Sequence, residues 1–499
     1  MVLFTVLCYK VIVIPTSLIR IFSREERMNQ IRLIIPATLL AIFFLDLAPA
    51  FSQDLPERKL GLEDAVRIAM KQNPDLTSAR LEVKRSDARV MEAWGNALPS
   101  VDLSSQYVHF VDKPVSYFPD YLIYPLTKIL DSTIHTPAAT GQLVLMQGSL
   151  TPGFTAGASV NVKQILFNGA VFVGVGAAHV YSHLARDLYQ AKQVETVTKV
   201  RKAYYGALLA REALEMMRSS LRNAEDNFKN VQLMRRQGIV SEYDELRATV
   251  GVDNLRPAVL QSENNLNLAL DALRNTIGIA NEEILLADSL AFAAVDDTLL
   301  EHAEGLVIES NPNLSAVARQ IELNGAIVKA ERSSYLPTIA AFGSYSYQGI
   351  RNDFNFSTND FYKSSQVGLS FSLNLFQGMQ TYARVEQAQL EERKSEEQKI
   401  NLERTLKTGV HSVIGNLKQA RKRVEAQQRT VETAERGYKI VTTRFLANAA
   451  TQLEVNDAQL ALTQAKVNRI QSVYDYLVAS ADLDQLLGRL PSYAIESSY

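Results

Sequence analysis

The sequence predicts an α+β chain built from two copies of one unit, each with a pair of short strands and a set of long helices. Three observations support this prediction. An ordered set of landmarks occurs twice, four segments alternate in polarity with a period of two, and long segments repeat apolar residues with a period of about 3.5.

The internal repeat is plainest at paired proline motifs. The run Asn73–Leu76 (Asn-Pro-Asp-Leu) recurs as Asn311–Leu314 (Asn-Pro-Asn-Leu), and Leu98-Pro99 recurs as Leu336-Pro337, both 238 residues later. Asparagine suits a helix N-cap and proline suits the first helical position. Each copy therefore predicts a helix that starts at the first proline and stops before the second.

These landmarks set the expected organisation of the chain. We place the first repeat at 53–278, a connecting segment at 279–310, the second repeat at 311–488 and a C-terminal tail at 489–499.

The segment 1–52 has the composition of a targeting signal. From Met28, the positive residue Arg32 precedes an apolar run and small residues that offer a cleavage site before Gln53. Residues 1–27 are also apolar, and we interpret them as a start codon placed too far upstream. One unusually long signal or anchor is the alternative.

Four strands are expected at about 100–112, 156–167, 338–350 and 365–376, because apolar and polar residues alternate through these segments. One apolar and one polar face suits a membrane barrel with lipid outside and water inside. A half-buried sheet in a soluble domain shows the same alternation, so the strands alone leave both interpretations open.

The linkers within both strand pairs are rich in aromatic residues: Tyr117, Phe118, Tyr121 and Tyr124, then Phe354, Phe356, Phe361 and Tyr362. An aromatic girdle at a membrane interface has this composition, and so does a carbohydrate-binding surface.

Long helices are predicted after Gly169 and Gly378, where the apolar period changes from two to about 3.5. From Gly169 to Gly238 a straight helix would span on the order of 100 Å. A shorter helix returns from Ser241 to Gly278 and nearly matches that length when stacked on the helix that starts at Pro74. Each copy therefore offers one continuous and one interrupted helical column.

The helices turn back at two tips, expected at about 238–244 and about 446–454. Gly238 suits the left-handed conformation that ends a helix, and Ser241 suits the cap of the next one. In the second copy these roles fall to an asparagine and a threonine.

Four strands cannot close a barrel, and each unpaired backbone group in hydrocarbon costs several kcal/mol. The strand edges must therefore pair with other copies of the chain. Two copies would give eight strands with a filled interior, and three would give twelve, which is wide enough for water. The pattern itself does not choose between them.

Over the whole mature chain, the sequence resembles the TolC family of outer-membrane efflux proteins. The resemblance rests on the duplicated proline motifs, on the strand ends Leu166–Gly169 (Leu-Phe-Asn-Gly) and Leu375–Gly378 (Leu-Phe-Gln-Gly), and on the run Gly238–Leu246. It implies a homotrimer in the outer membrane, with a 12-stranded β-barrel and a periplasmic α-barrel of 12 coiled-coil columns. It also implies a periplasmic adaptor, an inner-membrane RND or ABC pump, and contact with outer-membrane lipid.

The resemblance also assigns roles to the tips. It places the periplasmic mouth and the adaptor-docking surface at Gly238, Ile239, Val240, Ser241, Asn448 and Thr451. It places acidic rings that narrow the mouth at Asp244, Glu454 and Asp457. Turn formation and a solvated helix face are the respective alternatives.

One departure from the family concerns the closed mouth. Asp244 matches a position that bonds across to a tyrosine and an arginine in the family, and here those two positions hold Phe445 and Ala450. Neither side chain can hydrogen-bond, so the latch is expected to differ, with Arg444 as a substitute or with none.

Several classes of function find no support. The net charge is −2, which argues against a nucleic-acid partner. The single cysteine, Cys8, falls in the targeting segment. His179 and His183 are one helical turn apart but lack a third ligand. We therefore expect no catalytic residue, no cofactor and no metal site.

The sequence thus predicts an exit duct of a tripartite efflux pump or a type I secretion system, which passively conducts substrates to the exterior. A periplasmic coiled-coil adaptor and an exported helical scaffold are the alternatives.

Overall fold

The structure is a computed structural model that describes residues 58–495 apart from 114, 122–139, 148–151 and 280–281. The targeting segment expected at 1–52 lies outside the described residues, as do Tyr124 and residues 496–499 of the expected tail. Residues from Glu57 onward form one compact unit.

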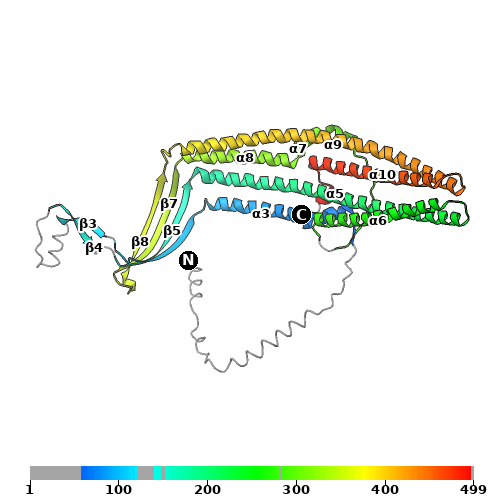
Figure 1. Ribbon diagram of the computed structural model, residues 1–499. Helices are drawn as coiled ribbons and strands as arrows, with labels where there is room; N and C mark the ends of the chain where they lie inside the picture. Colours follow the sequence, from blue (N-terminus) through cyan, green and yellow to red (C-terminus); the bar gives the residue numbers. More distant parts are fainter. Residues whose placement is uncertain (1–57, 114, 122–139, 148–151, 280–281, 496–499) are drawn as a thin grey trace, which may run out of the picture. The chain divides into compact units, whose positions relative to one another are not determined.

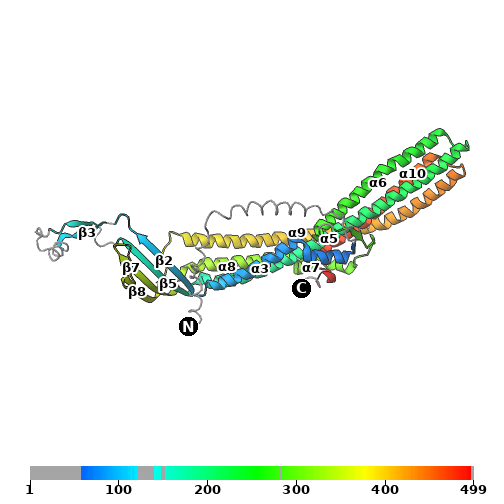
Figure 2. The same ribbon diagram turned by 90° about the horizontal axis from the view of Figure 1, so that it is seen from below.

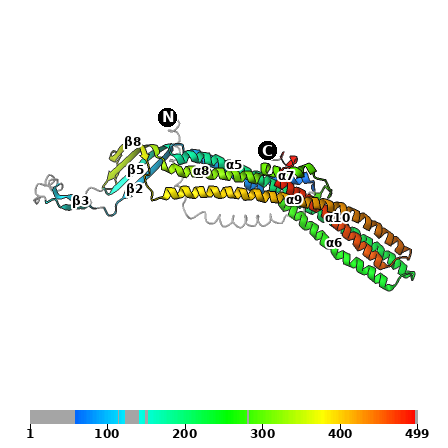
Figure 3. The ribbon, with the colours of Figure 1, turned by 90° about the horizontal axis from the view of Figure 1, so that it is seen from above.

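The helices form four columns that lie side by side (Figures 1 and 3). Two columns are single helices, α5 (Gly169–Arg236) and α9 (Gln380–Leu446). The other two are interrupted, and they pair α3 (Pro74–Gly95) with α6 (Glu242–Ile277) and α8 (Pro312–Arg332) with α10 (Gln452–Leu486). Contacts give the order α3/α6, α5, α8/α10, α9. The predicted continuous and interrupted column of each repeat is confirmed.

None of the helices in the described part of the chain combines the length and the apolarity that a membrane crossing requires.

The asparagine-proline motifs start helices as predicted. The Asn73 side chain accepts a hydrogen bond from the backbone N–H of Leu76 at 3.0 Å, and Asn311 accepts one from Asn313 at 2.9 Å. A proline fills the first turn in both helices.

The four expected strands form one antiparallel sheet in the order β2-β5-β7-β8. They are β2 (Ser100–His109), β5 (Phe154–Phe167), β7 (Thr338–Arg351) and β8 (Phe361–Ser372). Figure 2 shows them together at one end of the helical columns. A separate hairpin, β3 (Val115–Pro119) with β4 (Leu143–Gln147), occupies the longer linker. The strand ends differ from expectation by up to four residues. The largest difference is in β8, which was expected to start at about 365 but already begins at Phe361, where Phe361 pairs with Gly349.

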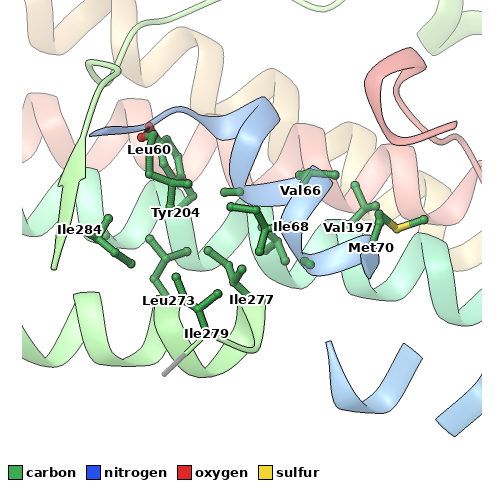
Figure 4. Close-up of a cluster of buried hydrophobic side chains, with 14 of the residues drawn as sticks. Leu60, Val66, Ile68, Met70, Val197, Tyr204, Leu273, Ile277, Ile279 and Ile284 are labelled. Carbon is green, nitrogen blue, oxygen red and sulfur yellow. Dashed lines mark hydrogen bonds between the residues drawn. The ribbon is translucent and has the colours of Figure 1, made fainter. Parts of the chain in front are cut away.

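Two hydrophobic clusters pack around the middle of the columns. The first surrounds α2 (Leu62–Gln72) and a parallel pair, β1 (Arg58–Leu60) with β6 (Ile284–Leu286), as Figure 4 shows. The second joins α7 (Asp297–Ser310) to α8, α9 and α10. A last helix, α11 (Ser492–Ile495), lies against α2.

Tyr204 carries the polar contact of the first cluster. Its side chain is 1% exposed. Its hydroxyl lies 3.0 Å from the Leu60 carbonyl oxygen and 2.8 Å from Oδ2 of Asp288. Burial raises the pKa of the Tyr204 phenol, so it remains a neutral donor at physiological pH.

We predict that Tyr204→Phe lowers the free energy of unfolding by about 0.5–1.5 kcal/mol, because it removes the hydrogen bond of a buried hydroxyl. The acceptors keep other donors, since the Leu60 carbonyl also accepts from the Ala287 N–H and the Asp288 carboxylate from the Leu62 N–H. Thermal unfolding of the detergent-solubilised protein measures this. Tyr382→Phe is the matched control, since that side chain is 57% exposed on α9. Equal shifts in both variants would show that the hydroxyl adds no stability.

Candidate functional site

The β-sheet has one polar and one apolar face. Strand register places two polar rows across all four strands: Asp102, Asn161, Ser344 and Gln366, then Ser104, Ser159, Ser346 and Ser364. Between them, on the other face, lies the row Leu103, Val160, Tyr345 and Ser365. The hydroxyls of Ser104 and Ser159 are 2.8 Å apart, so the second row carries a side-chain hydrogen bond between β2 and β5.

The apolar face lacks cover from the described residues. Val367 is 90% exposed, Leu103 is 77% exposed and Leu369 is 72% exposed. An apolar surface of this extent requires a protein partner or a lipid environment, because its exposure to water is unfavourable.

The outermost strands of this sheet are β2 and β8. Within the described chain, the outer edge of each has no strand partner. In hydrocarbon these edges must pair with other copies, since the lipid offers no hydrogen bonds.

The first helical tip is a tight, capped turn. Gly238 has φ 71°, and the N–H of Ile239 donates to the Met234 carbonyl at 2.9 Å. Ser241 accepts from the N–H of Asp244 at 3.2 Å, and the Asp244 carboxylate accepts from the Ser241 N–H at 3.1 Å. The predicted turn and cap roles of Gly238 and Ser241 are confirmed.

The second tip repeats this geometry. Asn448 has φ 57°, and the N–H of Thr451 donates to the Glu454 carboxylate at 2.6 Å. These bonds from Thr451 lower the pKa of the Glu454 carboxyl, because they stabilise its charged form. Asn448 and Thr451 thus fill the roles that the sequence predicts.

The acidic residues at the tips differ in how they are engaged. Asp244 and Glu454 cap their own helices, and Glu242 and Glu245 pair with Arg235. A further tip carboxylate, Asp457, is exposed and has no partner among the described residues. Of the three candidates for the constriction, Asp457 alone has a carboxylate without a partner among the described residues.

Asp457 lies in an exposed stripe of α10 between Leu453, 42% exposed, and Leu460, 69% exposed. The equivalent stripe of α6 carries Arg247 in place of the aspartate. Each of the two charged residues stands three positions after a capping carboxylate.

Arg247 lies over the Tyr243 ring, 5.6 Å from its centre. Sequence reasoning missed Arg247, although a comparison of the two repeats at the Asp457 position would have found it.

Phe445 joins the two hairpins near their tips. Its side chain is 3% exposed and packs with Val231, Ala248 and Val455, so that α5, α6, α9 and α10 all contribute to one cluster. Arg444 does not reach across the tips, because its guanidinium donates to the Ala449 carbonyl at 2.8 Å in its own turn.

The structure places His179 and His183 on an exposed face of α5. Within the part of the chain that is described, no group of three or more histidine, cysteine, aspartate or glutamate side chains could hold a metal ion.

A two-faced sheet with open edges, continued by long helical columns, defines the subunit of an outer-membrane channel. The chain belongs to the outer membrane efflux protein family, whose sequence pattern matches residues 147–279 and 305–489, more than half of the chain. It is a homotrimeric outer-membrane efflux or secretion channel that extends into the periplasm and works with an adaptor and an inner-membrane pump.

Comparisons with individual proteins agree with this family assignment. The chain is 24% identical over 337 residues to outer membrane protein TolC of Vibrio cholerae, which covers 67% of this chain and 76% of that protein. It is 22% identical over 341 residues to the cobalt-zinc-cadmium resistance protein CzcC of Cupriavidus metallidurans, which covers 67% and 77%. The fold is similar to the CmeC outer membrane channel of Campylobacter jejuni, with a TM-score of 0.68 at 16% identity over 86% of this chain and 85% of that one.

Proposed function

We propose that the protein is a passive duct that catalyses no reaction and takes its driving force from the inner-membrane pump. The observation that supports this proposal is the two-faced sheet. In a closed trimer its polar rows would line a water-filled lumen, and its apolar rows would face lipid.

Spin labels can test the orientation of the two faces. We predict that a label at Leu103→Cys in lipid vesicles is accessible to oxygen, which concentrates in the hydrocarbon. A label at Ser104→Cys would instead be accessible to a water-soluble nickel complex. Both variants use a Cys8→Ser background, and electron paramagnetic resonance measures the accessibilities. The same profile at both positions would overturn the proposed duct.

The hairpin tips would form the periplasmic mouth and dock the adaptor. Ile239 is 46% exposed at the first turn, whereas Val240 packs partly against the Phe445 cluster. Direct contact would therefore fall to Ile239, Gly238 and the equivalent Asn448 turn.

At the mouth, Asp457 and Arg247 would alternate around the threefold axis. Equivalent stripes of the two repeats carry them, so three carboxylates and three guanidiniums would share one level of the pore. Opposite charges at one level weaken each other, and selectivity would follow whichever charge lies closer to the axis.

Neutralising Asp457 and neutralising Arg247 are expected to shift ion selectivity in opposite directions. Asp457→Asn should lower the cation-to-anion permeability ratio and Arg247→Gln should raise it, each by about two- to five-fold. Reversal potentials in planar bilayers under a salt gradient measure both, and each variant serves as the control for the other. An unchanged reversal potential in both variants would show that neither side chain acts on ions in the pore.

The Phe445 cluster would hold the mouth closed in place of the polar latch of the family. We predict that Phe445→Ala raises the resting conductance, because truncation of a buried phenylalanine costs about 3–5 kcal/mol of packing. Single-channel recording checks this.

Leu446→Ala is the control for that experiment, since its side chain is adjacent and 54% exposed. Equal conductance in Phe445→Ala and wild type would argue that another contact closes the mouth.

A further inference from the structure

The apolar face of the sheet carries its charges at one end only. Three basic side chains, His109, Arg351 and Lys363, occur among the residues of β2, β5, β7 and β8 on this face, and no acidic side chain does. All three lie in the half of the sheet that is farther from the helical columns. Rows nearer the helices carry aliphatic residues such as Val101, Val162 and Leu369.

Two of these basic groups are already engaged. The Arg351 guanidinium contacts Asp353 at 2.6 Å and Asp360 at 3.0 Å. The His109 ring stacks on Phe154, with ring centres 4.3 Å apart and planes 6° from parallel.

Lys363 is the basic group of this face that has no described partner. It is exposed, and its cross-strand neighbour is Tyr347. The Tyr347 ring stacks on Phe361, with centres 4.9 Å apart and planes 16° from parallel. Lys363, which has no described partner, is therefore the cross-strand neighbour of one member of a stacked ring pair, toward the end of a surface that otherwise suits hydrocarbon.

This combination specifies the chemistry of an occupant. An ammonium group at the edge of a hydrocarbon-facing surface favours an anionic headgroup, and a phosphate supplies such a charge. The apolar faces of aromatic rings pack against the faces of sugar rings, whereas a simple diacyl phospholipid offers no such ring. Charge and shape together favour a headgroup that carries both a phosphate and a sugar.

We propose that Lys363, together with the Tyr347–Phe361 ring pair, binds the phosphorylated sugar headgroup of a glycolipid in the outer leaflet. The proposal rests on the outward orientation of the apolar face in the duct. Since β8 is an edge strand, each of these sites lies beside the boundary with the next protomer.

The test uses the full-length trimer in nanodiscs of three compositions: phosphatidylcholine alone, phosphatidylcholine with bisphosphorylated lipid A, and phosphatidylcholine with phosphatidylglycerol. Native mass spectrometry counts the bound anionic lipid. We expect wild type to retain lipid A, and Lys363→Gln to retain about five-fold less, as the loss of one cation at an anionic surface predicts. Lys163→Gln makes the same chemical change on the polar face, where Lys163 pairs with Ser100, and should retain lipid A like wild type.

Each other result overturns the proposal. Equal retention by Lys363→Gln and Lys163→Gln would remove Lys363 from the binding surface. An equal loss of phosphatidylglycerol and lipid A in Lys363→Gln would show that any anionic lipid suffices, against a sugar-bearing occupant. The spin-label experiment separates this failure from a failure of the proposed duct. If the label at Leu103→Cys is accessible to oxygen but Lys363→Gln retains lipid A like wild type, the duct stands and only the headgroup site is wrong.

Discussion

The rest of the structure depends on one constraint, which is that the backbone groups along the outer edges of β2 and β8 cannot remain unpaired in hydrocarbon. The edges oblige the chain to meet further copies of itself. The same copies also supply packing partners for the helices. The outermost columns, α3/α6 and α9, each have one flank that no other column in the described part of the chain covers. Because each chain supplies four strands and four helical columns, the same number of copies closes the ring of strands and the ring of columns.

The helical half of the molecule is held by contacts of a different kind. Around the middle, buried side chains such as Tyr204 and Leu273 join the start of the first repeat to the segment between the repeats. Near the tips a small cluster around Phe445 ties the hairpins together. Between these two clusters, scattered buried apolar residues such as Leu214 and Leu462 alternate with polar contacts such as that of Ser220 with Thr463. A well-packed middle and a lightly held tip suit a tube that is rigid along its length and opens at its end.

The sequence predicted those features that depend on neighbours along the chain. Periodicity revealed the strands and columns, and the asparagine-proline motifs revealed the helix starts. Features that depend on distant residues were not predictable in this way. The cluster at Phe445 needs four helices, and the exposure of Lys363 on the apolar face needs the strand register. Asp244 was interpreted as a pore residue, yet the spacing from Ser241 is that of a capping box, which the sequence already displays.

The duplication itself has an evolutionary consequence. Because each repeat supplies two strands and two columns, six copies of an ancestral half-length chain would close the same rings as three copies of this one. Fusion of two halves frees the tips to diverge within a single gene. The difference between Asp457 and Arg247, and between Asn448 and Gly238, requires that the two halves be encoded separately, as they are in this chain. An unfused ancestor would have carried the same residue six times around its rim.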